Sequence, residues 1–89
     1  MTIPPRTFNE LSERDKLRVL VLKHLTDKQR EVWEYHHWHG YSFRTIALHL
    51  DLSRTTVTDR YDAACRTLRK HGVRFTPDGR PYLEEQQPA

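Results

Sequence analysis

The sequence predicts an all-α domain of four helices whose last two helices form a helix-turn-helix, with a short β-hairpin after the final helix. Three observations support this fold class. Apolar residues recur at helical spacing in four successive segments. A residue suited to capping a helix precedes each segment. The last two segments are separated by the spacing of a tight helix–helix turn. We expect the helices at about residues 12–25, 27–39, 43–50 and 54–71.

The composition indicates a compact middle with polar ends. The chain of 89 residues has room for one small domain, and its hydrophobic fraction of 36% stands against 30% charged residues. We expect a flexible arm over residues 1–11, a helical domain over 12–72, and a hairpin with a disordered tail over 73–89. No apolar run reaches the ~20 residues of a membrane helix, and no export leader precedes the domain. These features predict a cytoplasmic protein without membrane contacts.

The first helix is expected to begin after Ser12, whose hydroxyl can cap it, with Asp15 at the third helical position in a capping-box arrangement. A helix of this length is marginal alone in water, so its apolar stripe must be covered. Packing on its own domain is the favoured solution because so short a chain has few apolar contacts to spare. Val19 and Leu22 widen the apolar face, so a homodimer with Trp38 as a contributor is the alternative. The stripe consists of Leu17, Leu20, Val21 and Leu25.

The second helix carries the clearest start signal. Thr26 and Gln29 form a T-x-x-Q capping box, and Asp27 suits the positive end of the helix dipole. Gly40 is expected to end the helix in the C′ position. The inward face should be made by Val32, Trp33 and one of His36 and His37.

The third and fourth helices follow Ser42 and Ser53, which can cap them. Tyr41 and Ile46 are spaced for a hydrophobic staple on the third helix. Gly72 is expected to close the fourth helix. The inward positions of the third helix are Ile46, Ala47 and Leu50, and those of the fourth are Val57, Tyr61, Ala64 and Leu68, with Cys65 beside them.

After Gly72 the pattern changes from helical to extended. The Pro-Asp-Gly tip within 76–79 stands between two short runs that carry apolar residues, which is a hairpin signal. Pro81 would restrict its strand to a sheet edge. From Glu84 onward the chain is polar, and we expect a disordered tail.

The spacing across residues 42–71 is typical of a helix-turn-helix. Ala47 is small where two helices cross closely, and Asp51 stands where the turn needs a left-handed residue. Leu52 can plug the turn, and Val57 can pack the second helix onto the first. A small residue, a turn residue and an apolar plug at these fixed offsets together indicate the motif.

The residues of this motif carry a family resemblance. The segments 25–32, 40–47 and 50–60, followed by Ala64, Leu68 and Arg69, resemble region 4 of bacterial sigma factors. They are similar, less closely, to the DNA-binding domain of LuxR-type regulators. The resemblance covers about residues 25–71 and implies a module that reads the upstream promoter element through the major groove and docks on the flap of RNA polymerase.

The chain departs from that family in several ways. Asp51 replaces the usual turn glycine, and the end of the second helix is rich in aromatic and histidine residues. The sigma region that melts promoter DNA has no counterpart, so we do not expect a complete sigma factor. Small free-standing modules of this kind resemble bacteriophage regulators, which suggests a bacterial cell or a phage-infected host.

The outward face of the fourth helix offers candidates for reading DNA bases. Arginine can bind guanine through two hydrogen bonds, aspartate can accept from cytosine, and threonine can contact a thymine methyl. Asp59 has an alternative partner in an arginine of its own helix. The predicted base contacts are Arg54, Thr55, Thr58 and Asp59.

Basic residues are concentrated in the middle of the chain. Residues 40–72 contain six basic and three acidic side chains, a net charge of +3. Such an excess suits the phosphate backbone of double-stranded DNA, although a solvated surface explains it too. The predicted phosphate contacts are Ser42, Arg44, Thr56, Arg60, Arg66, Arg69 and Lys70.

Enzymatic and metal-binding functions find little support. There is no glycine-rich phosphate loop and no nucleophile with an obvious base, so we predict no catalytic residues and no cofactor. His36 and His39 share a helix face, but two ligands are too few for a metal site. The single Cys65 can form neither an internal disulfide nor a CxxC site, and we interpret it as a packing residue.

Three functions remain open at this stage. The first is a DNA-binding transcription regulator. The second is a protein-interaction module that engages RNA polymerase, a sigma factor or another regulator. The third is the DNA-recognition subunit of a phage packaging machine. The basic, threonine-bearing face of the fourth helix favours DNA, whereas Asp59 and Asp62 on that face oppose tight nonspecific binding.

Overall fold

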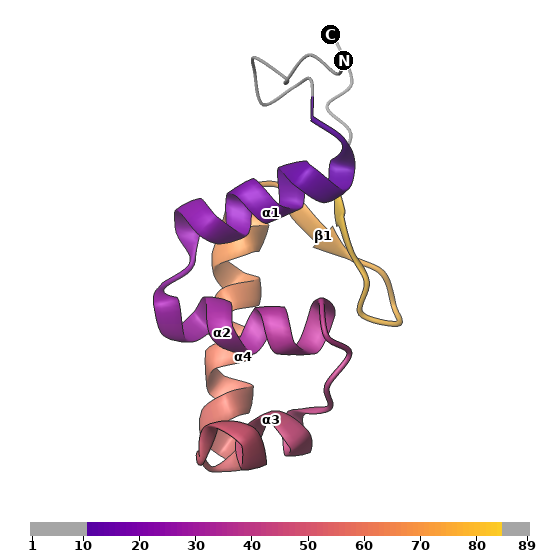
Figure 1. Ribbon diagram of the computed structural model, residues 1–89. Coiled ribbons are helices and arrows are strands. Elements are labelled where there is room, and N and C mark those ends of the chain that lie inside the picture. Colours follow the sequence, from indigo (N-terminus) through magenta and orange to yellow (C-terminus); the bar gives the residue numbers. More distant parts are fainter. Residues whose placement is uncertain (1–10, 85–89) are drawn as a thin grey trace, which may run out of the picture.

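The computed structural model describes residues 11–84 and confirms the predicted fold class: four helices followed by a two-stranded antiparallel hairpin. Figure 1 shows the longest helix as the axis of the molecule, with the other helices crossing it. The elements are α1 (Glu13–His24), α2 (Asp27–His37), α3 (Phe43–Leu50), α4 (Arg54–Lys70), β1 (Val73–Phe75) and β2 (Pro81–Leu83).

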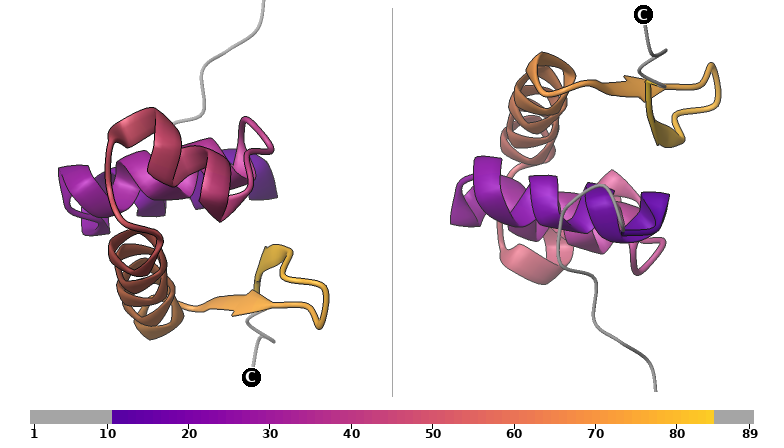
Figure 2. Two further views of the ribbon diagram at one scale, coloured as in Figure 1. Left: turned by 90° about the horizontal axis from the view of Figure 1, so that it is seen from below. Right: turned by 90° about the horizontal axis from the view of Figure 1, so that it is seen from above.

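Helix α4 organises the packing. It contacts α1, α2, α3 and β1. In Figure 2, α4 is seen along its axis, with the three shorter helices stacked on one side of it and the hairpin projecting beside its C-terminal end. One long side of α4 is therefore left without a covering element among the described residues.

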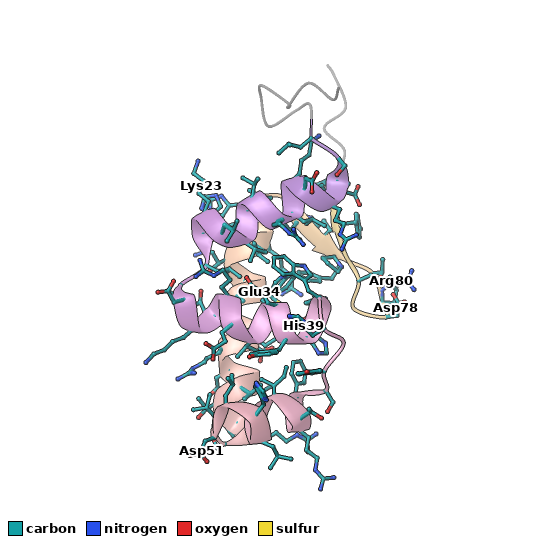
Figure 3. The ribbon with its side chains drawn as sticks, viewed as in Figure 1. Lys23, Glu34, His39, Asp51, Asp78 and Arg80 are labelled. Carbon is teal, nitrogen blue, oxygen red and sulfur yellow. The ribbon has the colours of Figure 1, made fainter. Side chains whose placement is uncertain are left out.

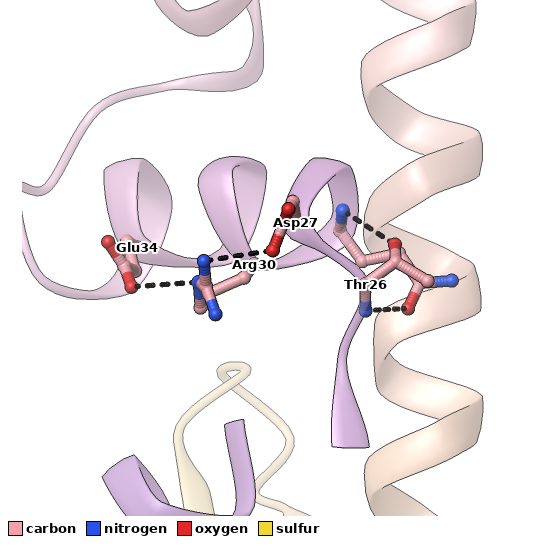
Figure 4. Close-up of polar contacts among 5 residues, drawn as sticks. Thr26, Asp27, Arg30 and Glu34 are labelled. Carbon is pink, nitrogen blue, oxygen red and sulfur yellow. Dashed lines mark hydrogen bonds and ion pairs between the residues drawn. The ribbon is translucent and has the colours of Figure 1, made fainter. Parts of the chain in front are cut away.

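Each helix begins at a hydroxyl cap, as the sequence predicts. Each capping hydroxyl accepts a hydrogen bond from the backbone N–H three residues on, at 3.1–3.2 Å. At Thr26 the arrangement is reciprocal, because the Gln29 side chain accepts from the Thr26 backbone N–H (Figure 4). At Ser12, the hydrogen bonds found within residues 11–84 include only the hydroxyl half of the expected capping box. The caps are Ser12, Thr26, Ser42 and Ser53.

The apolar core has two clusters that share Tyr61 as a neighbour. The larger one joins α1, α2, the C-terminal half of α4 and the hairpin, so the stripe of α1 packs on its own domain as expected. The smaller one joins α2, α3 and the start of α4. The larger cluster contains Val21, Leu25, Trp33, Ala64, Cys65, Leu68 and Val73, and the smaller contains Val32, Ile46, Ala47 and Val57.

The end of α2 differs from the prediction. The helix stops at His37, two residues early, and Gly40 takes the left-handed conformation (φ 73°) farther along than the C′ position. The backbone N–H of Tyr41 donates to the carbonyl of Tyr35, and the two rings stack with centroids 5.5 Å apart. The chain leaves the helix early because this turn folds Tyr41 back onto α2. Ile46, the expected staple partner of Tyr41, is buried in the smaller cluster.

The hairpin is ordered through Glu84, which corrects the expectation of a tail beginning there. Val73 pairs with Leu83, and Gly72 supplies the left-handed residue after α4 (φ 91°). The backbone N–H of Glu84 donates to the carbonyl of Gly72 at 3.0 Å, and its carboxylate pairs with Arg74 at 2.9 Å. The rest of the expected tail, and all of the expected arm except Leu11, lie outside the described residues.

Candidate nucleic-acid interface

Helices α3 and α4 form a helix-turn-helix at one end of the molecule. The three residues between them turn the chain sharply, and Asp51 adopts the left-handed conformation (φ 55°, ψ 48°) at the point where the sequence requires it. The N–H of Leu52 donates to the carbonyl of Ala47 at 2.9 Å and closes the turn. Figure 3 shows Asp51 at the end of the molecule opposite α1.

The crossing of α3 and α4 is held by small and branched apolar side chains. Ala47 is nearly buried and Val57 is fully buried, in the same cluster as Ile46. Leu52 is half-buried against that cluster. The predicted small residue, turn residue and plug thus occupy the positions that the sequence assigns to them, and they fix the start of α4 relative to α3.

Three of the four predicted base contacts are exposed on the first two turns of α4. They are Arg54, Thr55 and Asp59, and Asp59 has no ion-pair partner anywhere in residues 11–84. Thr58 differs, because it is half-buried and its hydroxyl donates to the carbonyl of Arg54 at 2.7 Å. Since Asp59 forms no ion pair in residues 11–84, the alternative of a pair with an arginine of α4 is wrong in this structure.

Four predicted phosphate contacts surround this end. Arg44 is exposed on the first turn of α3, and Ser42 caps that helix. Thr56 and Arg60 are half-buried on the flank of α4. Ser42, Arg44 and Thr56 lie at the N-terminal ends of the two helices, where the helix dipoles favour anions, whereas Arg60 lies in the second turn of α4.

The other three predicted phosphate contacts lie at the far end of α4. Arg69 is about 22 Å along the helix axis from Arg54, at 1.5 Å per residue. Its guanidinium lies 5.2 Å from the Phe75 ring centroid, and its carbonyl accepts from Arg74. The structure therefore divides the predicted contacts into a near group and this distant group of Arg66, Arg69 and Lys70.

Two hydroxyl pairs at the near end were not predicted from the sequence. Ser42 and Thr45 share a hydrogen bond of 2.9 Å, and Ser53 and Thr56 share one of 2.8 Å. In both cases the serine also caps its helix. The repeated Ser-x-x-Thr pattern at the two helix starts was the available signal.

The histidine-rich segment at the end of α2 joins the helices together. The Nε2 atom of His37 shares a 2.7 Å hydrogen bond with the Tyr61 hydroxyl of α4, and Trp33 packs on the His37 ring at 4.0 Å. Burial, with a smaller contribution from neighbouring His36, lowers the pKa of His37 to about 4. Burial also raises the pKa of Tyr61. A neutral His37 is thus a structural link between α2 and α4.

His36 and His39 do not converge on a metal site. The Nδ1–H of His36 donates to the carbonyl of Tyr41 at 2.8 Å, and its ring stacks on Phe43. His39 is exposed, and its ring lies near Tyr35. In residues 11–84, no three His, Cys, Asp or Glu side chains are grouped so that they could hold a metal ion. Cys65 is buried in the larger cluster, where burial raises its pKa, as suits a packing residue.

A hollow beside α2 is lined mainly by polar side chains. Arg30 bridges Asp27 at 3.0 Å and Glu34 at 3.8 Å within it (Figure 4). These pairs are partly exposed and contribute little stability. The hollow is lined by Asp27, Arg30, Glu31, Glu34, Tyr35 and His39.

Comparison with known proteins supports the helix-turn-helix assignment. The family model for sigma-70, region 4 matches residues 21–70. No curated protein and no solved structure matches the chain. None of the helices in residues 11–84 has the length and apolar character needed to cross a membrane. The matched segment spans more than half of the chain, including all of α2, α3 and α4, and the protein therefore belongs to the sigma-70 region 4 family of DNA-binding helix-turn-helix domains.

Proposed function

We propose that the protein is a sequence-specific transcription regulator that places the N-terminal end of α4 in the major groove of double-stranded DNA. The observation that carries this proposal is the exposure of Arg54, Thr55 and Asp59 on the first turns of a helix that is held rigidly against α3. Recognition helices present their N-terminal residues to base edges in this way. In the proposed complex Arg54 binds guanine and Asp59 accepts a hydrogen bond from cytosine.

Phosphate contacts in the proposed complex come first from the near group. Arg44 and Arg60 supply positive charge, and Ser42 and Thr56 lie at helix N-termini that favour an anion. Arg66, Arg69 and Lys70 contribute only if the DNA extends along α4. Their distance from Arg54 makes the two groups separable by mutation.

The test compares two arginines on DNA selected by the wild-type chain from a random-sequence pool. Arg54→Ala should cost about 1–3 kcal/mol on the best site and relax the preference at one base pair. Arg44→Ala should weaken binding to all sequences alike and reduce the salt slope by about one. Gel shifts at two salt concentrations measure both effects.

Lys70→Ala in the same assay reports on the distant group. A reduced salt slope would extend the phosphate contacts along the length of α4, and an unchanged slope would confine them to the near group. Equal losses on every sequence for Arg54→Ala and Arg44→Ala would contradict base reading by Arg54.

A protein-interaction role is the second candidate, and exposed apolar groups on α1 and at the end of α2 favour it. Leu22 is 53% exposed and Val19 36%, and Trp38 is 37% exposed beneath the guanidinium of Arg18 at 4.7 Å. Members of the family interact with RNA polymerase as well as with DNA. Sedimentation of the wild-type chain and of Leu22→Ser, alone and mixed with bacterial RNA polymerase, would detect a homodimer or a polymerase complex that uses this face.

A further inference from the structure

Six hydroxyl side chains lie on the starts of α3 and α4, and their hydrogen bonds differ in a way that bears on DNA reading. Five of the six are engaged within the protein, and one is not. A hydroxyl has one proton to donate and two lone pairs to accept with, so the internal bonds decide what each can offer a ligand. The six residues are Ser42, Thr45, Ser53, Thr55, Thr56 and Thr58.

The two serine–threonine pairs keep one donor each. In the pair Ser42–Thr45, one hydroxyl donates to the other, and the second O–H stays available. The pair Ser53–Thr56 has the same pattern. Phosphate oxygens only accept hydrogen bonds, so the one remaining O–H of each pair suits a phosphate contact.

Thr58 has already used its only proton. Its hydroxyl donates to the carbonyl of Arg54 at 2.7 Å, along the helix. The hydroxyl therefore cannot donate to an acceptor on a base edge. The hydroxyl keeps only its capacity to accept, and beside it Thr58 offers a base its methyl group.

In contrast to Thr58, Thr55 has a hydroxyl that is free to bind a ligand. Its side chain is exposed, and its hydroxyl has no hydrogen-bond partner in the described part of the chain. Both its donor and its acceptor capacity are available. Thr55 and Thr58 are three residues apart and lie on neighbouring positions of one helix face.

Building on the DNA-binding function proposed above, we propose that Thr55 and Thr58 read different chemistry in the same DNA site. Thr55 forms a hydrogen bond with a base edge through its hydroxyl. Thr58 contacts the 5-methyl group of a thymine through its own methyl group. The major groove displays both kinds of group, so the two threonines would specify two different positions.

Four substitutions in the full chain separate the two roles. Valine keeps the branched shape of threonine and removes the hydroxyl, whereas serine keeps the hydroxyl and removes the methyl. The probe is a DNA duplex selected by the wild-type chain from a random-sequence pool. Helix content by circular dichroism checks that each variant folds.

The two residues should respond in opposite ways. Thr55→Val should weaken binding about three- to tenfold, the value of one net hydrogen bond, and Thr55→Ser should bind as the wild type. Thr58→Ser should weaken binding about fourfold, the value of one buried methyl-sized group, and Thr58→Val should bind as the wild type. Replacing the thymine that Thr58 contacts by deoxyuridine should weaken DNA binding by the wild-type chain and leave DNA binding by Thr58→Ser unchanged.

Two kinds of failure can be told apart. The division of roles would be overturned if Thr55→Val bound the selected duplex as tightly as the wild type. It would also be overturned if Thr58→Val weakened binding as much as Thr58→Ser does. Either result would leave the proposed DNA-binding function standing. A wild-type chain that selects no sequence over random DNA would overturn the proposed function, and this inference with it.

Discussion

Asp51 shows how a single residue can carry strain at the centre of a functional motif. Its left-handed backbone (φ 55°) costs an L-residue with a side chain about 1–2 kcal/mol, whereas glycine adopts this conformation readily. We expect Asp51→Gly to raise the free energy of unfolding by about 0.5–1 kcal/mol, because glycine's larger loss of chain entropy offsets part of the relief. Urea denaturation measures the change.

Asp51→Val is the matched control, since a β-branched residue is poorly suited to positive φ. It should lower the free energy of unfolding by about 1–2 kcal/mol relative to wild type. A Gly variant less stable than wild type would show that the Asp51 side chain contributes more than its backbone strain costs.

His37 makes the stability of the protein sensitive to pH. Its pKa is about 4 in the folded chain against an ordinary value of 6.5, so the unfolded state binds a proton more readily than the folded state. Stability from this residue is complete above pH 6.5 and falls as the pH drops from 6.5 toward 4. Allowing for the partial exposure of the ring, we expect a loss of about 1–2 kcal/mol across this range.

The control for His37 is His37→Gln, which retains a polar group near Tyr61 but does not titrate. Thermal unfolding of both chains between pH 7 and pH 4 should give a smaller decline for the variant. Parallel declines would assign the pH dependence to other groups, such as His24, whose pKa is also lowered by desolvation and, to a smaller extent, by the positive charge of neighbouring His71.

Helix starts can be compared as elements, because the four caps share one geometry but differ in completeness. The start of α2 satisfies two backbone N–H groups through the reciprocal bonds of Thr26 and Gln29, whereas that of α1 satisfies one through Ser12. The double variant Thr26→Ala/Gln29→Ala, which removes both bonds, should therefore cost about 1 kcal/mol or more, and Ser12→Ala about half of that. Urea midpoints of the two variants provide the comparison, and an equal effect would show that the Gln29 bond adds nothing.

At the scale of the whole molecule, α4 joins the two core clusters into one cooperative unit. Val21 of α1 and Val57 of α4 are both fully buried, and each lies in a different cluster. Valine-to-alanine substitution at either position should lower the free energy of unfolding by roughly 2 kcal/mol. Because α4 belongs to both clusters, each variant should still unfold in a single transition.

Tryptophan fluorescence and far-ultraviolet circular dichroism test this expectation, since Trp33 lies in the larger cluster and the helices extend through both. Coincident transitions are expected for both variants. An early fluorescence transition in Val21→Ala, with helical signal retained, would show that α1 and the hairpin detach while the helix-turn-helix stays folded.

The sequence by itself determined the helices, their caps, the hairpin and the turn of the helix-turn-helix. These features depend on residues within about four positions of one another, such as Thr26 with Gln29 or Ala47 with Asp51. The inward stripes also followed from periodicity alone. Helix ends were less well defined, and α2 stopped early because Tyr41 returns to stack on Tyr35.

Only the tertiary structure decided which predicted contact residues lie together and which of their hydrogen-bonding groups and charges are available to DNA. The hydrogen bond between His37 and Tyr61 joins residues 24 positions apart, and no local sequence pattern predicts it. The packing of Arg69 on the Phe75 ring required the hairpin to be placed, whereas the separation of Arg69 from Arg54 follows from the length of α4 alone. The sequence specifies the chemistry of each side chain. The partners that accept its hydrogen bonds or pack on its charged group are determined by packing between distant segments.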